Sequence, residues 1–182
     1  MATTKLVTVE ELEQMPDDGN HYELIRGELI CMSPSGERHG DVSMNIAGAM
    51  WSFVRRGQLG KVLVADVGFV LARDPDVVLA PDVSFVRADR LLPERDPSRF
   101  PQLAPDIAVE VISPSDRAGH ISAKVMEYLD AGVRILWLVD PGRQIVTVYT
   151  PDRTGRIFGV EEVLDGGDVL HCFSLTIAEI FA

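Results

Sequence analysis

LAPDVSFV (residues 79–86) and PDIAVEVISPSD (residues 105–116) are two short apolar runs of the kind that buried β-strands show. Each run contains an acid at a position where an apolar residue would cost less free energy to bury. These acids are Asp82 in the first run and Glu110 in the second. An ionised carboxylate in such a strand needs a cation, a metal ion or hydrogen-bond donors, so both acids are candidates for a functional site.

The second run predicts which way Glu110 points. Side chains alternate along a strand with period two, so Ile107, Val109 and Val111 face one side of the sheet. Ala108, Glu110 and Ile112 face the other side. Glu110 is therefore expected to be flanked on its own face by apolar residues.

Asp82 follows Pro81 at the entry of the strand predicted for residues 83–86. Two carboxylates on neighbouring strands can converge on one divalent ion. Mg²⁺ suits such a pair because it takes one or two carboxylates and keeps several waters. Asp82 and Glu110 are therefore the candidate metal ligands, with Mg²⁺ or Mn²⁺ as the expected cofactor.

The segment RAGHISAKVMEYLDAGV (residues 117–133) is expected to form a helix, with Ser115 or Asp116 as N-cap and Gly132 at its end. Lys124 lies beside the apolar stripe of this helix and can lean over the strand end that carries Glu110. The stripe recurs at helical spacing and consists of Ile121, Val125, Tyr128 and Leu129. Asp82, Glu110 and Lys124 are therefore expected to meet at one edge of a sheet.

Other interpretations of these residues remain open. Asp82 after a proline can cap the start of a strand, and Glu110 and Lys124 can form a buried ion pair without a catalytic role. Lysines on helices are usually solvated. Glu23 lies between Tyr22 and Leu24 in a predicted strand, where spacing alone leaves it either facing solvent or facing the site.

Taken in order, five phrases of the chain resemble a family of bacterial restriction-endonuclease-like proteins, the Uma-two group of the PD-(D/E)XK nuclease superfamily. The resemblance runs from about Val7 to Phe181, and its phrases are YELIRGELI (22–30), LAPDVSFV (79–86), DIAVEVISPSD (106–116), KVMEYLDAGV (124–133) and LWLVDP (136–141). Position 112, two after Glu110, holds isoleucine where the simplest superfamily pattern has lysine. The resemblance therefore places the lysine role on Lys124, in the helix.

This resemblance implies a Mg²⁺-dependent endonuclease that hydrolyses DNA phosphodiester bonds, with catalytic residues Asp82, Glu110, Lys124 and Glu23. It also implies a restriction-endonuclease-like α/β fold, in which helices flank a mixed sheet. His39 lies where the family tends to carry a histidine, although a lone histidine near a helix start is more often polar surface.

The net charge of −11 and the pI of about 4.7 are the main argument against a nucleic-acid substrate, because phosphate backbones are bound by Lys and Arg. Local basic patches remain open in two segments, around Arg87, Arg90, Arg95 and Arg99 and around Arg55, Arg56 and Lys61. The alternatives to a DNA nuclease are a catalytically silent protein- or DNA-interaction module and a hydrolase of small phosphoesters.

The 182 residues fit a single domain, with additional hairpins predicted near both ends, at HYELI/ELICMS and at EEVL/DVLHCF. Exposed apolar strands in these hairpins favour a homodimer. Neither a membrane-spanning run nor a signal peptide is recognisable, so a cytoplasmic protein without a membrane partner is expected. Cys31 and Cys172 lie in apolar, strand-like surroundings and are expected to be buried thiols.

Overall fold

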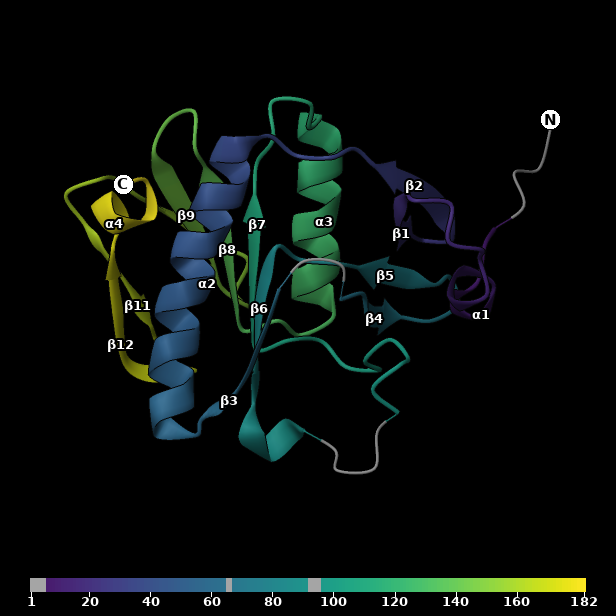
Figure 1. Cartoon of the computed structure of the whole chain (residues 1–182), viewed down its shortest axis with the longest axis horizontal. Coiled ribbons are helices and arrows are strands. Elements are labelled where there is room, and N and C mark those ends of the chain that lie inside the picture. Colours follow the sequence, from purple (N-terminus) through teal and green to yellow (C-terminus); the bar gives the residue numbers. More distant parts are fainter. Residues whose placement is uncertain (1–5, 65–66, 92–95) are drawn as a thin grey trace.

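The computed structural model describes residues 6–64, 67–91 and 96–182. Within these residues the chain has a mixed α/β fold in which helices flank the sheets, as predicted (Figure 1). The N-terminal hairpin (residues 21–32) and the N-terminal helix lie at one end of the molecule, and the last hairpin and the C-terminal helix lie at the other. No described helix is long and apolar enough to cross a membrane.

The central sheet has six strands in the order β10-β9-β8-β7-β6-β3. Its strands are β3 (Gly60–Val64), β6 (Val83–Arg87), β7 (Ile107–Val111), β8 (Ile135–Asp140), β9 (Ile145–Tyr149) and β10 (Gly155–Phe158). Strands β7 and β8 are parallel and the other pairs are antiparallel. The connection from β7 to β8 runs through α3 (Ala118–Asp130), which confirms the predicted parallel crossover.

A second sheet has four strands in the order β2-β1-β5-β4 and carries the N-terminal hairpin. Its strands are β1 (His21–Ile25), β2 (Glu28–Met32), β4 (Phe69–Ala72) and β5 (Val77–Leu79). Arg26 and Gly27 both have positive φ, at 53° and 79°, which is the conformation of a two-residue hairpin turn. Helix α1 (Val9–Glu13) precedes this sheet and begins with the capping box formed by Thr8 and Glu11.

The segment from Lys61 to Ala72, expected from its apolar pattern to be two strands or one bent strand, forms two strands in different sheets. Strand β3 pairs with β6 in the central sheet, whereas β4 pairs with β5 in the second sheet. The short connection between them therefore links the two sheets.

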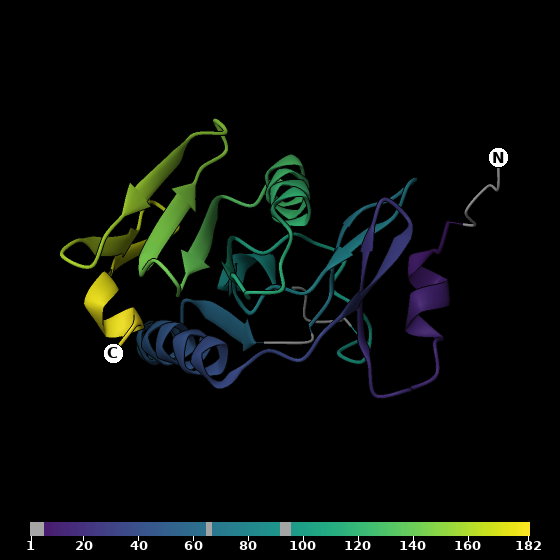
Figure 2. The ribbon, with the colours of Figure 1, turned by 90° about the horizontal axis from the view of Figure 1, so that it is seen from above.

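The C-terminal hairpin consists of β11 (Val163–Gly166) and β12 (Leu170–Thr176) and leads into α4 (Ile177–Ile180). This hairpin packs with the long helix α2 (Glu37–Gly57) on one face of the central sheet, around Trp137 and Phe173. Helix α3 packs on the opposite face (Figure 2). Its residues Tyr128 and Leu129 belong to the same buried cluster as Leu136 of β8. A 3₁₀ turn, η1 (Ala88–Arg90), follows β6.

The ends of α3 differ in how well their sequence predicts them. Gly132 has a φ of 86°, and the backbone N–H groups of Gly132 and Val133 donate to the carbonyls of Leu129 and Tyr128, which is the Schellman ending that a glycine favours. The N-cap is Arg117, without a side-chain cap bond, so the prediction of Ser115 or Asp116 is wrong. Asp116 instead accepts a hydrogen bond from the backbone N–H of Ser113.

Both cysteines are exposed and unpaired, so the prediction of buried thiols is wrong. Cys31 falls on an exposed position of the edge strand β2. Cys172 has a φ of 64°, and both it and His171 are exposed within β12, so this strand does not alternate regularly between buried and exposed residues. An irregular strand of this kind cannot be anticipated from apolar neighbours alone.

Candidate active site

The centre of the site is an ion pair between strand β7 and helix α3. Lys124 Nζ lies 2.7 Å from Glu110 Oε2, and the hydroxyl of Tyr128 donates a 2.6 Å hydrogen bond to Glu110 Oε1. Lys124 and Tyr128 are four residues apart on α3 and so share one helix face. Each carboxylate oxygen of Glu110 therefore has its own partner, and both partners come from α3.

Glu23 joins this group from the second sheet. Its side chain is 2% exposed, and its Oε1 atom lies 3.1 Å from Lys124 Nζ and accepts a 2.9 Å hydrogen bond from the backbone N–H of Ala80. The lysine thus lies between two carboxylates from different sheets. The structure places Glu23 facing Lys124, and the alternative that it faces solvent is wrong.

Asp82 lies beside this group at the start of β6. Its Oδ2 atom accepts a 2.7 Å hydrogen bond from the backbone N–H of Val111, which follows Glu110 on the neighbouring strand. Its Oδ1 atom lies 3.3 Å from Nε2 of His39, in the first turn of α2. His39 was interpreted mainly as polar surface, but the structure places its half-buried ring against Asp82.

The charges of these groups act on one another. Burial raises the pKa of Glu110 to about 7; the attraction of Lys124 opposes this shift, and repulsion from Glu23 and Asp82 adds to it. Burial disfavours the charge of Lys124, but the attraction of Glu110 and Glu23 outweighs burial and keeps its pKa above the ordinary value. The hydrogen bond with Asp82 raises the pKa of His39.

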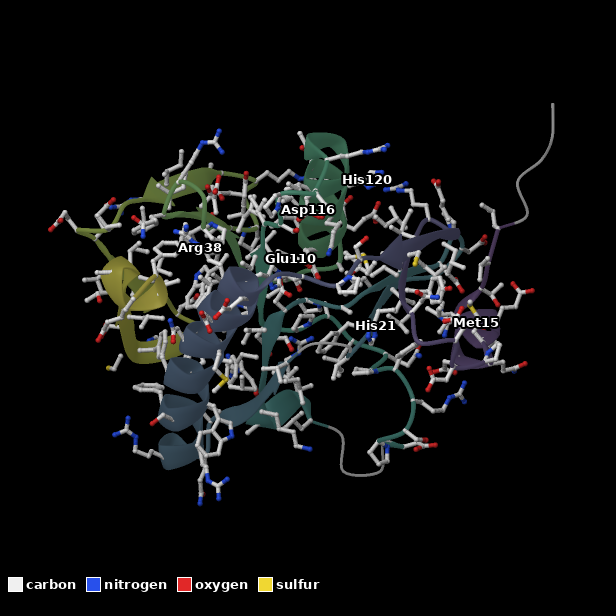
Figure 3. All side chains as sticks on the ribbon, turned by 45° about the horizontal axis from the view of Figure 1, so that its top comes forward. Met15, His21, Arg38, Glu110, Asp116 and His120 are labelled. Carbon is white, nitrogen blue, oxygen red and sulfur yellow. The ribbon has the colours of Figure 1, made fainter. Side chains whose placement is uncertain are left out.

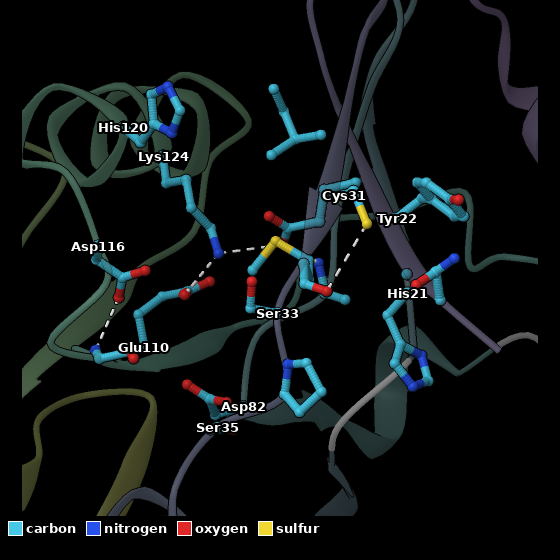
Figure 4. Close-up of a pocket in the computed structure, with 18 of the residues that line it drawn as sticks. His21, Tyr22, Cys31, Ser33, Ser35, Asp82, Glu110, Asp116, His120 and Lys124 are labelled. Carbon is cyan, nitrogen blue, oxygen red and sulfur yellow. Dashed lines mark hydrogen bonds and ion pairs between the residues drawn. The ribbon is translucent and has the colours of Figure 1, made fainter.

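These residues lie at one side of a cavity of about 710 Å³. Its walls come from the β1–β2 hairpin, from the first two turns of α3 and from the segment after β7. Figure 4 shows Glu110, Lys124 and Asp116 on one side of the pocket and Tyr22, Cys31 and His21 on the other. Three carboxylates and one ammonium group are therefore gathered where a small part of a substrate can reach them.

The residues present fit a magnesium ion of the water-rich kind. No three His, Cys, Asp or Glu side chains of the described part of the chain are placed to hold a metal ion by themselves. Asp82 and Glu110 offer two hard oxygen donors from paired strands, and Mg²⁺ is typically held by one or two carboxylates while it keeps several waters. An added positive charge would also offset the excess of carboxylates.

All four residues predicted for the site are brought together by the structure: Asp82, Glu110, Lys124 and Glu23. Tyr128 was missed, because its aromatic ring was counted only as part of the apolar stripe of α3. The available signal was its spacing of four residues from Lys124, which places the two side chains on the same helix face.

Comparisons with known proteins agree with this fold. A family model described as Uma2, putative restriction endonuclease, matches residues 9–178. The chain is also similar in structure to a putative nuclease belonging to DUF820 from Anabaena variabilis ATCC 29413, with a TM-score of 0.83 and 20% sequence identity over 96% of this chain and 97% of that chain. At this identity the structural likeness shows the fold alone. No curated protein matches the chain in sequence.

Proposed function

The chain belongs to the Uma2 family, described as putative restriction endonucleases, and from this membership we propose that it is a Mg²⁺-dependent endonuclease that hydrolyses DNA phosphodiester bonds. Family and fold support a nuclease-like protein. The DNA substrate, the metal and the roles of individual residues are our proposal.

The observation that carries the proposal is the imbalance of charge at the cavity. Glu23 and Glu110 share a single ammonium group, Lys124, while Asp82 lies beside them against His39. Burial already raises the pKa of Glu110 to about 7, and repulsion from Glu23 and Asp82 adds to this shift. A cluster built only to stabilise the fold would balance its charges, because unpaired buried acids cost free energy. An arrangement with too many carboxylates favours a bound cation.

Asp82 and Glu110 would hold Mg²⁺, or Mn²⁺ in its place. When bound, such an ion polarises the scissile phosphate and lowers the pKa of a coordinated water. Asp82 is steadied for this task by the backbone N–H of Val111 and by the ring of His39. Glu110 is fixed by the hydroxyl of Tyr128.

Lys124 supplies a fixed positive charge and three N–H donors beside the carboxylates. With two acids within 3.1 Å it is held as an ammonium ion, so it acts as a donor that orients the attacking water or contacts the phosphate. Glu23 positions this ammonium group. The second contact of Glu23, with the backbone N–H of Ala80, holds its carboxylate in place.

The test combines metal binding with plasmid nicking in the same samples. Mg²⁺ and Mn²⁺ are titrated by calorimetry into the wild type and into Asp82→Asn, Glu110→Gln and Lys124→Met. We expect both carboxylate variants to lose metal binding and all three variants to lose nicking. Glu127→Gln is the matched control. Glu127 is a buried acid that lies on the same helix as Lys124, but it pairs with Arg26 outside the cavity.

The outcomes separate the alternatives. Metal binding that depends on Asp82 and Glu110, without nicking of any DNA, would contradict the endonuclease and favour a hydrolase of small phosphoesters. Absence of metal binding at millimolar concentrations would leave a structural ion pair inside an interaction module. Equal loss in Glu127→Gln would mean that the substitutions act only through the fold.

A further inference from the structure

Most cations of this acidic protein are neutralised by neighbouring acids. The chain has 17 Lys and Arg residues, and Lys5 and Arg95 lie outside the described residues, which leaves 15. Ten of these form ion pairs with carboxylates: Arg26, Arg73, Arg87, Arg90, Arg99, Lys124, Arg134, Arg143, Arg153 and Arg156. The guanidinium group of a paired arginine is less available to bind a phosphate group of a substrate.

This pairing decides against one of the two basic patches that the sequence left open. In the segment from Arg87 to Arg99, Arg87 pairs with Asp89, Arg90 with the buried Asp106 and Arg99 with Glu13. The described arginines of this segment are therefore paired with acids and do not form a free patch for phosphates.

Five cations make no ion pair within the described part of the chain, and they fall into two groups. Arg55, Arg56 and Lys61 lie at the end of α2 and the start of β3, where Arg55 packs over the ring of Trp51 at 4.9 Å. Arg38 and Arg117 lie near the candidate active site. Because α2 rises 1.5 Å per residue, Arg38 and Arg55 are separated by roughly 25 Å along this helix.

Arg38 and Arg117 lie near the cavity, Arg38 in the first turn of α2 and Arg117 just before α3. Arg38 is exposed in the first turn of α2 and precedes His39, whose ring contacts Asp82. Arg117 is exposed, precedes α3 and lines the cavity itself. In Figure 3, Arg38 and His120, which lies in the first turn of α3, appear on opposite sides of Glu110 and Asp116.

We propose that Arg38 and Arg117 bind the backbone phosphates on either side of the scissile phosphate and so position a nucleic-acid strand across the cavity. This inference rests on the proposed function and adds the residues that let a protein with a net charge of −11 accept a polyanion. An arginine without a carboxylate partner presents its planar guanidinium group to phosphate oxygens, with two parallel hydrogen bonds. Such contacts set position without reading base sequence.

The contacts are measured by the salt dependence of binding. A fluorescein-labelled DNA duplex and its single strand are titrated with protein by anisotropy at salt concentrations from roughly 50 to 200 mM. Ca²⁺ replaces Mg²⁺, since it takes the same oxygen ligands. Arg38→Gln and Arg117→Gln should each lower the slope of log K against log[salt] by about 1, and the double variant by about 2.

Two variants serve as matched controls, since each also removes one positive charge. Arg56→Gln removes an unpaired arginine at the far end of α2, and Arg143→Gln removes one that pairs with Asp140. Neither should change the slope. Calorimetric titration of Mg²⁺ into Arg38→Gln and Arg117→Gln should give the wild-type affinity, because neither arginine contacts a proposed metal ligand.

The inference and the proposed function fail in different ways. An unchanged slope in the double variant, or an equal decrease in Arg56→Gln, would overturn the inference while wild-type nicking leaves the endonuclease intact. Wild-type binding with the expected slope but without nicking would sink the endonuclease and leave the two arginines as a binding surface. A wild type that binds neither form of DNA contradicts both.

Discussion

An acid lies near each end of strand β7, and the two acids have opposite surroundings. Asp106, just before the strand, has a side chain that is 1% exposed and is matched by donors: its Oδ2 accepts a 2.9 Å hydrogen bond from the N–H of Arg87, and its Oδ1 lies 2.8 Å from Arg90. Near the other end of β7, Glu110 shares one ammonium group with Glu23 and lies close enough to Asp82 to be repelled by it.

The difference distinguishes an acid that holds the fold, Asp106, from an acid that we propose for the active site, Glu110. Asp106 is balanced by its own cation, and its second hydrogen bond holds the chain at the end of β6. Glu110 belongs to a group with more negative than positive charge, and that group borders a cavity. An acid buried in a strand is thus not by itself a sign of a site, whereas an unbalanced cluster that borders a cavity is.

The largest effect on the stability of the fold is expected at Asp106, the acid whose charge is balanced by its own cation. Asp106→Ala leaves the N–H of Arg87 without its acceptor and the guanidinium of Arg90 without its carboxylate partner, which should lower the free energy of unfolding by about 3 kcal/mol. Denaturant unfolding measures this loss. Calorimetry should find Mg²⁺ binding unchanged in the folded variant, and weaker binding there would remove the distinction between the two ends.

Mg²⁺ bound near Glu110, at the end of β7 with excess negative charge, should stabilise the folded chain. At a concentration about one hundred times the dissociation constant, a ligand that binds only the folded chain adds about 2.7 kcal/mol to its stability. The melting temperatures of the wild type and of Asp106→Ala should rise when Mg²⁺ is added and fall again when EDTA removes it. The melting temperature of Glu110→Gln should not change. A response of all three proteins alike would place the metal elsewhere.

In EDTA, the ionisation of Glu110 should make stability depend on pH. Its pKa rises from the ordinary 4.5 to about 7, so the folded chain binds the proton more tightly than the unfolded chain. This contribution is complete below pH 4.5 and is lost as the pH rises through 7, by an amount on the order of 3 kcal/mol. The unfolding free energy of the wild type minus that of Glu110→Gln isolates it, and a difference that is flat between pH 5 and 8 would contradict it.

The smallest effect concerns Tyr128. Tyr128→Phe removes the donor to Glu110 Oε1 and leaves the ring in place, so Mg²⁺ affinity should fall about tenfold through looser orientation of the carboxylate. Tyr22→Phe is the control, because Tyr22 also donates from its hydroxyl to a carboxylate, that of Asp18, at the surface. Calorimetry on both variants distinguishes a positioning role from the general loss of a tyrosine hydroxyl.

Much of the site could be predicted because its residues follow local periodicities. Alternation along β7 fixes the face of Glu110, and the helical stripe of α3 fixes the side on which Lys124 leans. The parallel crossover from β7 to β8 then brings the two together. These steps need only the pattern of apolar residues and the handedness of the connection.

The rest depends on how distant elements pack, which no local pattern encodes. The side to which Glu23 points is set by the docking of its sheet against α3, and the contact of His39 with Asp82 is set by the path of α2 across the central sheet. The pairing of Arg87, Arg90 and Arg99 with acids likewise arises only in the folded chain. A count of basic residues along the sequence could not separate paired from unpaired cations.

Lys124 contacts carboxylates from two sheets, Glu110 from the central sheet and Glu23 from the second. In terms of folding kinetics, Glu23 and Lys124 are far apart in sequence, so their contact closes a long loop and is expected to form late. A chain whose second sheet has not docked would have Glu110 and Lys124 in contact, but Glu23 would be missing from the site. In such a molecule Lys124 would lack the second carboxylate that holds its ammonium group in place.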